Sequence, residues 1–168
     1  MAVCLEVSDR IWLAAANGET HVVISGERAA VAAAGQALLA AGADRVVPLA
    51  ITIAAHSPLM EPAVSRMRDL TARLTVSAPR VPVLSNLDTR PLATPEEVRH
   101  EIAEALLAPV RWLDCLYGLA SMGIDRFVEL SPRSTLVNAV ARALPDVDVS
   151  CPRPEELAAA LARTSGSQ

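Results

Sequence analysis

His56 is the side chain of this sequence that is best placed to do chemistry. It ends an apolar run from Val46 to Ala55, and the Ser57-Pro58 pair that follows predicts a turn and then a helix. An imidazole exchanges a proton near neutral pH, and α/β proteins commonly place reactive groups at the carboxyl ends of strands. A lone histidine beside an apolar run is more often structural, so this position alone leaves both interpretations open.

The other titratable groups are weaker candidates for chemistry. His21 lies in an expected strand and His100 on an expected helix, and both are interpreted as structural. Arg111 is interpreted as a packing and ion-pair anchor, and Asn86 either shapes a site or ends its strand. Four carboxylates are interpreted as helix-start and solvated-face charges rather than as a catalytic pair: Glu96, Glu97, Glu101 and Glu104.

Composition narrows the function classes. The chain has 168 residues, a net charge of −4 and 52% hydrophobic residues, which fits one domain or two small lobes and gives no electrostatic case for nucleic acid. Cys4, Cys115 and Cys151 lie far apart without metal-ligand spacing, so we expect no metal site and a reducing compartment. No apolar run approaches the roughly 18 residues of a membrane span, and no signal peptide is recognisable. These observations predict a cytoplasmic protein.

The first 49 residues are expected to form short strands and one helix. Asn17-Gly18 is a turn signal between two strands, and Gly42 closes the helix. The expected elements are strands at Ala2–Val7, Ile11–Ala16 and His21–Ile24, a helix at Glu27–Ala41 and a returning strand at Arg45–Leu49.

From Pro58 onward, helices are expected to alternate with single strands. The Thr94-Pro95-Glu96-Glu97 sequence is a capping box with proline at the first helical position. Helices are expected at Leu59–Leu74, from Thr94 to Leu107, at Val110–Met122, from Ser131 to Leu144 and at Pro154–Ala162, with strands at Val81–Leu84 (buried), Asp125–Leu130 and Val147–Val149. This alternation predicts a parallel sheet with helices on both faces.

Five motifs occur in an order and spacing that resemble one enzyme family. They are Val22-Val23-Ile24-Ser25-Gly26, His56-Ser57-Pro58-Leu59-Met60, Ser85-Asn86, Pro109-Val110-Arg111-Trp112 and Phe127-Val128-Glu129-Leu130. The chain resembles malonyl-CoA:acyl carrier protein transacylases and polyketide synthase acyltransferase domains from Met1 to about Leu161. The resemblance implies an α/β fold that is the C-terminal half of an α/β-hydrolase-like acyltransferase core, at residues 51–162. It also implies a small, truncated ferredoxin-like lobe at residues 1–50. Independently of the resemblance, the sequence of residues 163–168 predicts a disordered tail.

The resemblance implies a two-step acyl transfer. A serine attacks a malonyl-CoA or methylmalonyl-CoA thioester, and the acyl group then passes to the phosphopantetheine thiol of an acyl carrier protein. His56 corresponds to the family's catalytic base, which takes the serine proton and returns it to the leaving thiolate. No resident cofactor is implied, because the thioester is substrate and the phosphopantetheine belongs to the carrier protein.

Three further positions take roles from the resemblance. Ala105 corresponds to the residue whose main-chain carbonyl orients the imidazole. Asn17 corresponds to an asparagine that faces the active site, with the first residue of an Asn-Gly turn as an equal alternative. Ala55 precedes the histidine, where residue size bears on acyl choice. Its small side chain suggests weak exclusion of methylmalonyl groups, with malonyl still the expected main substrate.

Two features depart from the family pattern. The chain contains no G-x-S-x-G, so the nucleophile, the oxyanion groups and the carboxylate-binding arginine are expected before Met1. They would belong either to a longer enzyme of which this chain is one half or to a separate N-terminal partner. The alternative is a non-catalytic remnant or carrier-protein-binding module. In addition, only Ser8-Asp9-Arg10 separate the first two expected strands, where the family has a helix. Three residues permit a hairpin but no parallel crossover, which makes the pairing of residues 1–16 unusual.

Overall fold

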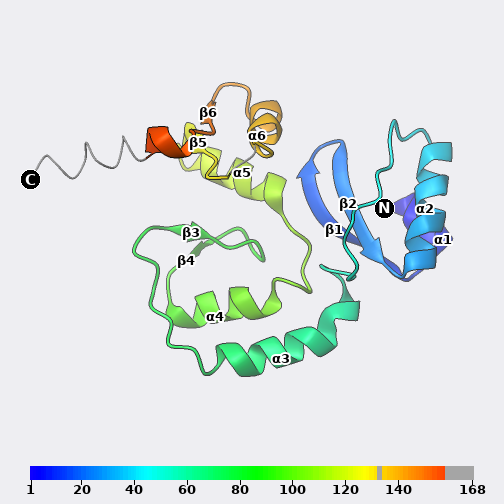
Figure 1. Ribbon diagram of the computed structural model, residues 1–168, viewed down its shortest axis with the longest axis horizontal. Helices are drawn as coiled ribbons and strands as arrows, with labels where there is room; N and C mark the ends of the chain where they lie inside the picture. Colours follow the sequence, from blue (N-terminus) through cyan, green and yellow to red (C-terminus); the bar gives the residue numbers. More distant parts are fainter. Residues whose placement is uncertain (132–133, 158–168) are drawn as a thin grey trace, which may run out of the picture. The chain divides into compact units, whose positions relative to one another are not determined.

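The computed structural model describes residues 1–131 and 134–157, and it has two compact units, Met1–Cys115 and Leu116–Gln168. The first unit contains α1 (Ala2–Val7), β1 (Ile11–Gly18), β2 (His21–Gly26), α2 (Arg28–Ala40), η1 (Pro58–Met60), α3 (Glu61–Thr71), β3 (Val83–Leu84), β4 (Pro91–Leu92) and α4 (Pro95–Glu104). Helix α5 (Trp112–Ser121) crosses the boundary, and β5 (Arg126–Val128), α6 (Val137–Ala143) and β6 (Asp148–Ser150) follow in the second unit (Figure 1). The fold is therefore mixed α/β.

Residues Ala2–Val7 form helix α1, so the predicted first strand is wrong. Alanine, leucine and glutamate favour a helix, and the helical turn carries Cys4 into a buried cluster with Ile11 of β1 and Ala34 of α2. The short connection at residues 8–10 is no longer anomalous, because it joins a helix to a strand rather than two parallel strands.

The hairpin of β1 and β2 is covered by α1 and α2, which lie on one side of it in Figure 1. Gly26 ends β2 opposite Ile11, and a Cβ at this glycine would collide with the carbonyl oxygen of Arg10. Glycine is required here because the two backbones approach so closely.

The turn of this hairpin lies two residues later than predicted. Gly18 pairs with His21, so Glu19 and Thr20 form the turn, and the prediction of an Asn17-Gly18 turn is wrong. Asn17 has no partner in the register, because β1 carries an irregularity between Ala16 and Gly18. An extra residue of this kind is a bulge, which changes the direction of the side chains that follow it.

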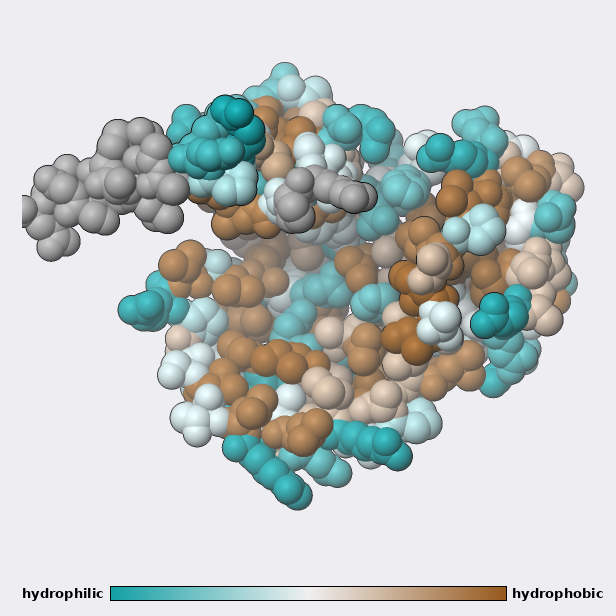
Figure 2. Space-filling view, in the orientation of Figure 1, coloured by the Kyte–Doolittle hydropathy of each residue, from teal (hydrophilic) through white to brown (hydrophobic). Residues whose placement is uncertain are grey.

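Residues 45–49 form no β-ladder, so the predicted returning strand is also wrong. A strand is stable only when a neighbour accepts its backbone hydrogen bonds, and none of the described strands pairs with this segment. Four large apolar side chains at alternate positions are each 54 to 60% exposed: Val47, Leu49, Ile51 and Ile53. Hydrophobic side chains are widespread on the surface drawn in Figure 2.

Helices α3 and α4 pack side by side, as Figure 1 shows. The expected helix from Leu59 begins with η1 and continues as α3. The predicted capping box is confirmed, since the Thr94 hydroxyl accepts a hydrogen bond from the Glu97 backbone and the Glu97 carboxylate accepts one from the Thr94 backbone. Helix α4 ends at Glu104 rather than at Leu107.

Strands β3 and β4 form a short antiparallel hairpin. The strand predicted at Val81–Leu84 is therefore present in its second half, but the predicted burial is wrong. Only Val83 and Leu84 are paired, and Val81 and Val83 are 73% and 48% exposed. Apolar character predicts that a segment seeks burial, but burial requires a covering layer, which the described residues do not provide here.

The second unit contains a parallel pair of strands. Strands β5 and β6 pair in register from Arg126–Asp148 to Val128–Ser150, with α6 between them in the chain. Helix α6 begins at Val137, later than expected, and residues 154–157 are helical. The rest of the expected last helix and the expected tail lie outside the described residues. Among the strands of residues 1–131 and 134–157, β1–β2 and β3–β4 pair antiparallel and β5–β6 pair parallel, so the expected parallel sheet is not formed as one sheet there.

Candidate functional site

His56 lies in a tight turn with an unusual backbone conformation. Its φ is 61°, a left-handed value that is uncommon for a residue other than glycine, and its N–H donates to the carbonyl oxygen of Leu106 at 2.8 Å. The hydroxyl of Ser57, which is 0% exposed, donates to the carbonyl oxygen of Ala54 at 2.7 Å. These bonds hold the turn in a conformation that the isolated chain would rarely adopt.

The imidazole of His56 is oriented by two main-chain carbonyl groups. Its Nδ1 lies 2.8 Å from the oxygen of Ala105 and 2.9 Å from the oxygen of Ala108. Carbonyl oxygens only accept hydrogen bonds, so Nδ1 must carry the proton in both contacts. In the neutral ring the lone pair is then on Nε2, which is the state of a histidine that can accept a proton.

The carbonyl group of Ala105 is free for this contact because of the sequence that follows it. In a continuing helix its oxygen would accept a bond from the backbone nitrogen four residues later, but that residue is Pro109, which has no N–H. Helix α4 ends at Glu104, and the N–H of Leu107 returns to the Glu104 carbonyl oxygen at 2.9 Å. The chain after α4 therefore presents unpaired carbonyl groups to the histidine turn.

The segment 105–111 is also fixed to β1. The N–H of Val110 donates to the oxygen of Ala14 at 2.8 Å, and the N–H of Ala16 donates to the oxygen of Val110 at 2.9 Å. These two bonds form a parallel bridge between Val110 and Ala15. The same short segment thus contacts the histidine turn at one end and the small hairpin at the other.

Asn86 holds the far end of this segment. Its Oδ1 accepts a hydrogen bond from the backbone N–H of Arg111 at 2.7 Å, and its Nδ2 donates to the carbonyl oxygen of Pro109 at 3.2 Å. Of the two interpretations of Asn86, the structure favours a shaping role over simple strand termination. The ion-pair interpretation of Arg111 is confirmed, since its Nε lies 2.9 Å from Asp114 Oδ2.

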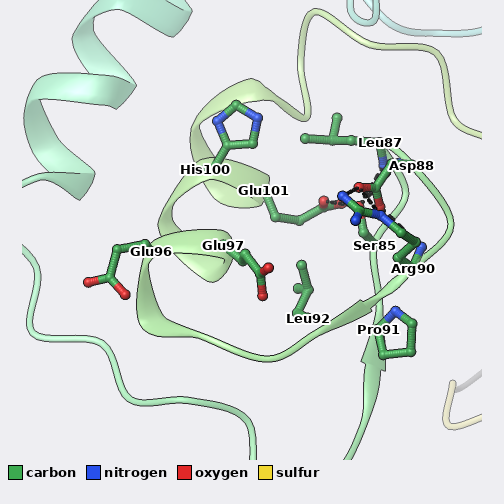
Figure 3. A pocket seen from close by; sticks show the side chains of 10 residues that line it. All are labelled: Ser85, Leu87, Asp88, Arg90, Pro91, Leu92, Glu96, Glu97, His100 and Glu101. Atoms are coloured by element: carbon green, nitrogen blue, oxygen red, sulfur yellow. Dashed lines mark hydrogen bonds and ion pairs between the residues drawn. The ribbon is translucent and has the colours of Figure 1, made fainter.

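The carboxylate of Glu101 is not a solvated-face charge, so that prediction is wrong. It extends from α4 toward the β3–β4 hairpin (Figure 3), where Oε2 accepts from the Ser85 hydroxyl at 2.6 Å and Oε1 from the Asn86 N–H at 2.8 Å. Ser85 is 3% exposed, so its hydroxyl requires such a partner. Between the hairpin and α4 is a cavity of about 730 Å³, separate from the His56 contacts, whose walls include Leu87, Leu92 and Glu101.

Glu104 is likewise engaged, contrary to the prediction. Arg68 of α3 binds its carboxylate through Nε at 2.6 Å and Nη2 at 2.8 Å, and it also reaches Glu61 at 2.6 Å. The hydrogen bonds from Arg68 lower the pKa of Glu104, and those to Glu104 and Glu61 raise the pKa of Arg68. This pair joins α3 to the end of α4, one residue before Ala105.

The structure brings His56, Ala55 and Ala105 into one region but records no such contact for Asn17. Asn17 is partly buried and lies two residues beyond Ala15, the residue that bridges to Val110, and within the described ranges its side chain makes no hydrogen bond to His56 or to the segment 105–111. Reasoning from the sequence missed the second carbonyl, at Ala108, and the role of Glu101. Pro109 was the available signal for the free carbonyl group, because it removes a helical donor.

Within residues 1–131 and 134–157, no group of three or more His, Cys, Asp or Glu side chains could hold a metal ion. In the same part of the chain, no helix combines the length and apolar character needed to cross a membrane.

The chain is similar to curated bacterial transacylases. It is 33% identical over 146 residues to the malonyl CoA-acyl carrier protein transacylase of Escherichia coli K12, covering 86% of this chain and 47% of that protein. The transacylase of Bacillus subtilis is 31% identical over 156 residues, with 91% and 49% covered. The chain therefore spans about half the length of these relatives.

Solved structures agree with this similarity. One is a type II polyketide synthase acyl carrier protein in complex with its malonyl-transacylase, with a TM-score of 0.89 and 29% identity over 96% of this chain and 53% of that one. A transacylase from Xanthomonas oryzae gives 0.87 and 32% over 96% and 52%. The acyl transferase domain family matches residues 2–165, nearly the whole chain. The chain is thus a member of the acyl transferase domain family that spans about half the length of its transacylase relatives.

Proposed function

We propose that this chain supplies the proton-accepting half of an acyl transfer site, with His56 as the base. The observation that supports this most directly is the pair of carbonyl contacts at Nδ1, which leaves Nε2 of the neutral ring with its lone pair. A serine hydroxyl is a weak nucleophile until a base within hydrogen-bond reach removes its proton. The role of Ala105 as the orienting carbonyl is part of the same proposal.

The proposed reaction has two steps, acylation of the serine and transfer of the acyl group to the carrier protein. The serine proton passes to Nε2 of His56 as the serine oxygen bonds to the thioester carbon, and the CoA thiolate leaves with that proton. The phosphopantetheine thiol of an acyl carrier protein then gives its proton to Nε2 and attacks the acyl-serine ester, and the serine oxygen leaves with the proton. In each step the ring is positively charged after it takes the proton and before it gives the proton to the leaving group. The two carbonyl dipoles directed at Nδ1 stabilise this charged ring.

The nucleophile in this proposal comes from a complementary half of the same family fold. The motif G-x-S-x-G is absent from the sequence, and the chain spans about half of its relatives. The exposed apolar segment from Val47 to Ile53 offers a surface that a complementary half would cover. Residues 51–162 are proposed as part of an α/β-hydrolase-like core and residues 1–50 as a ferredoxin-like lobe, in a cytoplasmic enzyme.

The proposed substrates are malonyl-CoA and an acyl carrier protein, with methylmalonyl-CoA as a poorer acyl donor. Support comes from the relatives, which are named as malonyl CoA-acyl carrier protein transacylases, and from the solved complex of such an enzyme with a carrier protein. Ala55 would border the acyl group, and Asn17 would face it from the hairpin.

A hybrid enzyme tests the proposal. The chain is fused to the preceding half of the Escherichia coli transacylase, and transfer of radiolabelled malonyl from malonyl-CoA to holo acyl carrier protein is measured. We expect transfer by the hybrid, a loss of about 10² to 10⁴-fold in His56→Ala, and none by the chain alone. Equal rates in the hybrid and its His56→Ala variant, or a folded hybrid that never forms an acyl-serine, would overturn the proposal.

A second candidate, a carrier-binding module without catalysis, is favoured only by the absence of G-x-S-x-G. It predicts that the chain alone binds a carrier protein in calorimetry while the folded hybrid remains inactive. The two candidates therefore give opposite outcomes in the hybrid assay.

A further inference from the structure

We infer that Asn86 is a positioning residue for His56, acting through the segment 105–111 and anchored by Glu101. This inference rests on the proposed function, in which the orientation of the imidazole matters. Asn86 and His56 are 30 positions apart in the sequence and are not hydrogen-bonded to each other. The inference rests on two sets of contacts to one segment. The side-chain amide of Asn86 is hydrogen-bonded to one end of the segment 105–111, and carbonyl groups of the same segment are hydrogen-bonded to His56.

Only a side-chain amide can make both contacts of Asn86. It must accept the Arg111 N–H at Oδ1 and, from the same planar group, donate to the Pro109 oxygen at Nδ2. Aspartate keeps the acceptor but loses the donor, and alanine loses both. The amide thus fixes the path of the chain from Pro109 to Arg111, which begins directly after Ala108.

Glu101 joins the two ends of the segment. Its carboxylate fixes Asn86 through the backbone N–H at 2.8 Å and fixes Ser85 through the hydroxyl at 2.6 Å. Its own carbonyl oxygen accepts the N–H of Ala105 at 3.1 Å, which sets the start of the segment. Glu101 therefore holds the start of the segment through its own carbonyl oxygen and the end of the segment through Asn86.

Small displacements of the segment would matter because both contacts at Nδ1 are already at hydrogen-bond length. Carbonyl oxygens at 2.8 and 2.9 Å are within range, whereas a shift of one ångström takes either beyond it. Without the two acceptors nothing holds the proton on Nδ1, and the ring can place it on Nε2. A ring with a proton on Nε2 cannot take one from a serine.

The test measures the tautomer of His56 directly. The full chain is labelled with ¹⁵N-histidine, and long-range ¹H–¹⁵N correlations are recorded at a pH where the rings are neutral. In the unmodified chain we expect Nδ1 to show the shift of a protonated nitrogen and Nε2 that of an unprotonated one. In Asn86→Ala we expect both shifts to move toward a mixture, and Asn86→Asp should lie between.

The controls separate positioning from general damage. Asn138→Ala makes the same substitution at an exposed site in α6 and should leave the His56 signals unchanged. His21 and His100 are exposed and serve as internal references in every spectrum. Unchanged His56 shifts in a folded Asn86→Ala variant would overturn the inference. If that variant does not fold, Asn86→Asp and Glu101→Gln, which keeps one acceptor, take its place, and unchanged His56 shifts in both would overturn the inference equally.

The kinetics of the hybrid enzyme test the positioning role of Asn86 independently of the tautomer measurement. Asn86→Ala should lower kcat by about tenfold or more with little change in KM for malonyl-CoA, because a misplaced base affects the chemical step. An inactive hybrid would count against the proposed function alone, since the tautomer measurement requires no turnover. A changed KM with an unchanged kcat would overturn the inference instead.

Discussion

The hydroxyl of Ser57 donates a 2.7 Å hydrogen bond to the carbonyl oxygen of Ala54, and this bond encloses the turn in which His56 has a φ of 61°. The turn is short and Ser57 is fully buried, so the imidazole has few ways to move apart from rotation about its own side-chain bonds. The left-handed backbone is a cost that the surrounding hydrogen bonds offset.

A pair of substitutions at His56 measures that cost. His56→Gly and His56→Ala both remove the imidazole, but only glycine relieves the left-handed strain of about 1–2 kcal/mol. Glycine also gives the unfolded chain more conformational entropy, which lowers the free energy of unfolding by about 0.4–1 kcal/mol. We expect the glycine variant to be more stable than the alanine variant by about 1 kcal/mol in urea unfolding. Ala55→Gly, at a position without positive φ, should be destabilising, and the opposite order at His56 would contradict the strain.

The size of residue 55 is predicted to affect acyl choice. Ala55→Phe in the hybrid enzyme should reduce transfer of methylmalonyl more than transfer of malonyl, because a ring next to His56 leaves less room for an α-methyl group. A methyl group in a pocket is worth about 1–3 kcal/mol, so the kcat/KM ratio should change by at least about fivefold. Competition between the two CoA thioesters measures it, and an unchanged ratio would exclude Ala55 as a selector.

Gly26, at the end of β2, and Gly42, just after α2, provide a matched pair of glycines. Gly26→Ala introduces a Cβ against the Arg10 carbonyl, whereas Gly42→Ala, at a φ of 98°, meets nothing within 4 Å. Overpacking against the backbone typically costs about 1–3 kcal/mol in addition to any conformational strain. We expect Gly26→Ala to be the more destabilising of the two by thermal unfolding. Equal losses would show that the close approach to Arg10 is not maintained.

Glu129 should make stability depend on pH in the acid range. Burial alone would raise the pKa of this carboxyl group, but hydrogen bonds from the Thr135 and Leu136 backbones and from the Ser131 and Thr135 hydroxyls lower it to about 2, from an ordinary 4.5. Because the folded pKa is the lower one, the stabilisation is complete above about pH 4.5 and is lost as the pH falls toward 2.

The measurement is the free energy of unfolding of the wild type and of Glu129→Gln between pH 2 and 6. The difference between the two proteins should be largest above pH 4.5 and should shrink as the pH falls. Glu6→Gln, in the exposed part of α1, is the control variant, and the slope assigned to Glu129 is the difference from that control. A difference that stays constant over this range would contradict the network around Glu129.

The sequence was sufficient to predict elements whose signals are local. The capping box at Thr94 and Glu97 and the helix after Pro58 were found because helix starts depend on a few adjacent residues. Ala2–Val7 was assigned to the wrong element because a short apolar run fits a strand or a helix equally well. The burial expected at Val81 failed because it depends on a covering layer that local sequence does not contain.

The candidate site shows the same division. The resemblance pointed to His56 and to the chain near Ala105, whereas the contacts of Glu101 join residues 15 and 16 positions apart. The sequence predicts that Glu101 is a solvated charge on its helix, and only the position of the β3–β4 hairpin reverses that. Long-range pairing of this kind is set by tertiary packing rather than by any repeat in the sequence.

The groups that orient the imidazole belong to the main chain, and this has a consequence for genetic screens. An alanine scan across residues 105–108 would delete the side chains of Leu106 and Leu107 but leave every orienting oxygen in place, so it would report only what those two side chains contribute to packing. Backbone ester substitution, which weakens a carbonyl as an acceptor without altering side chains, would reveal what such a scan misses. The substitutions tolerated at residues 105–108 would therefore report on side-chain packing and give no information on the orientation of the His56 ring.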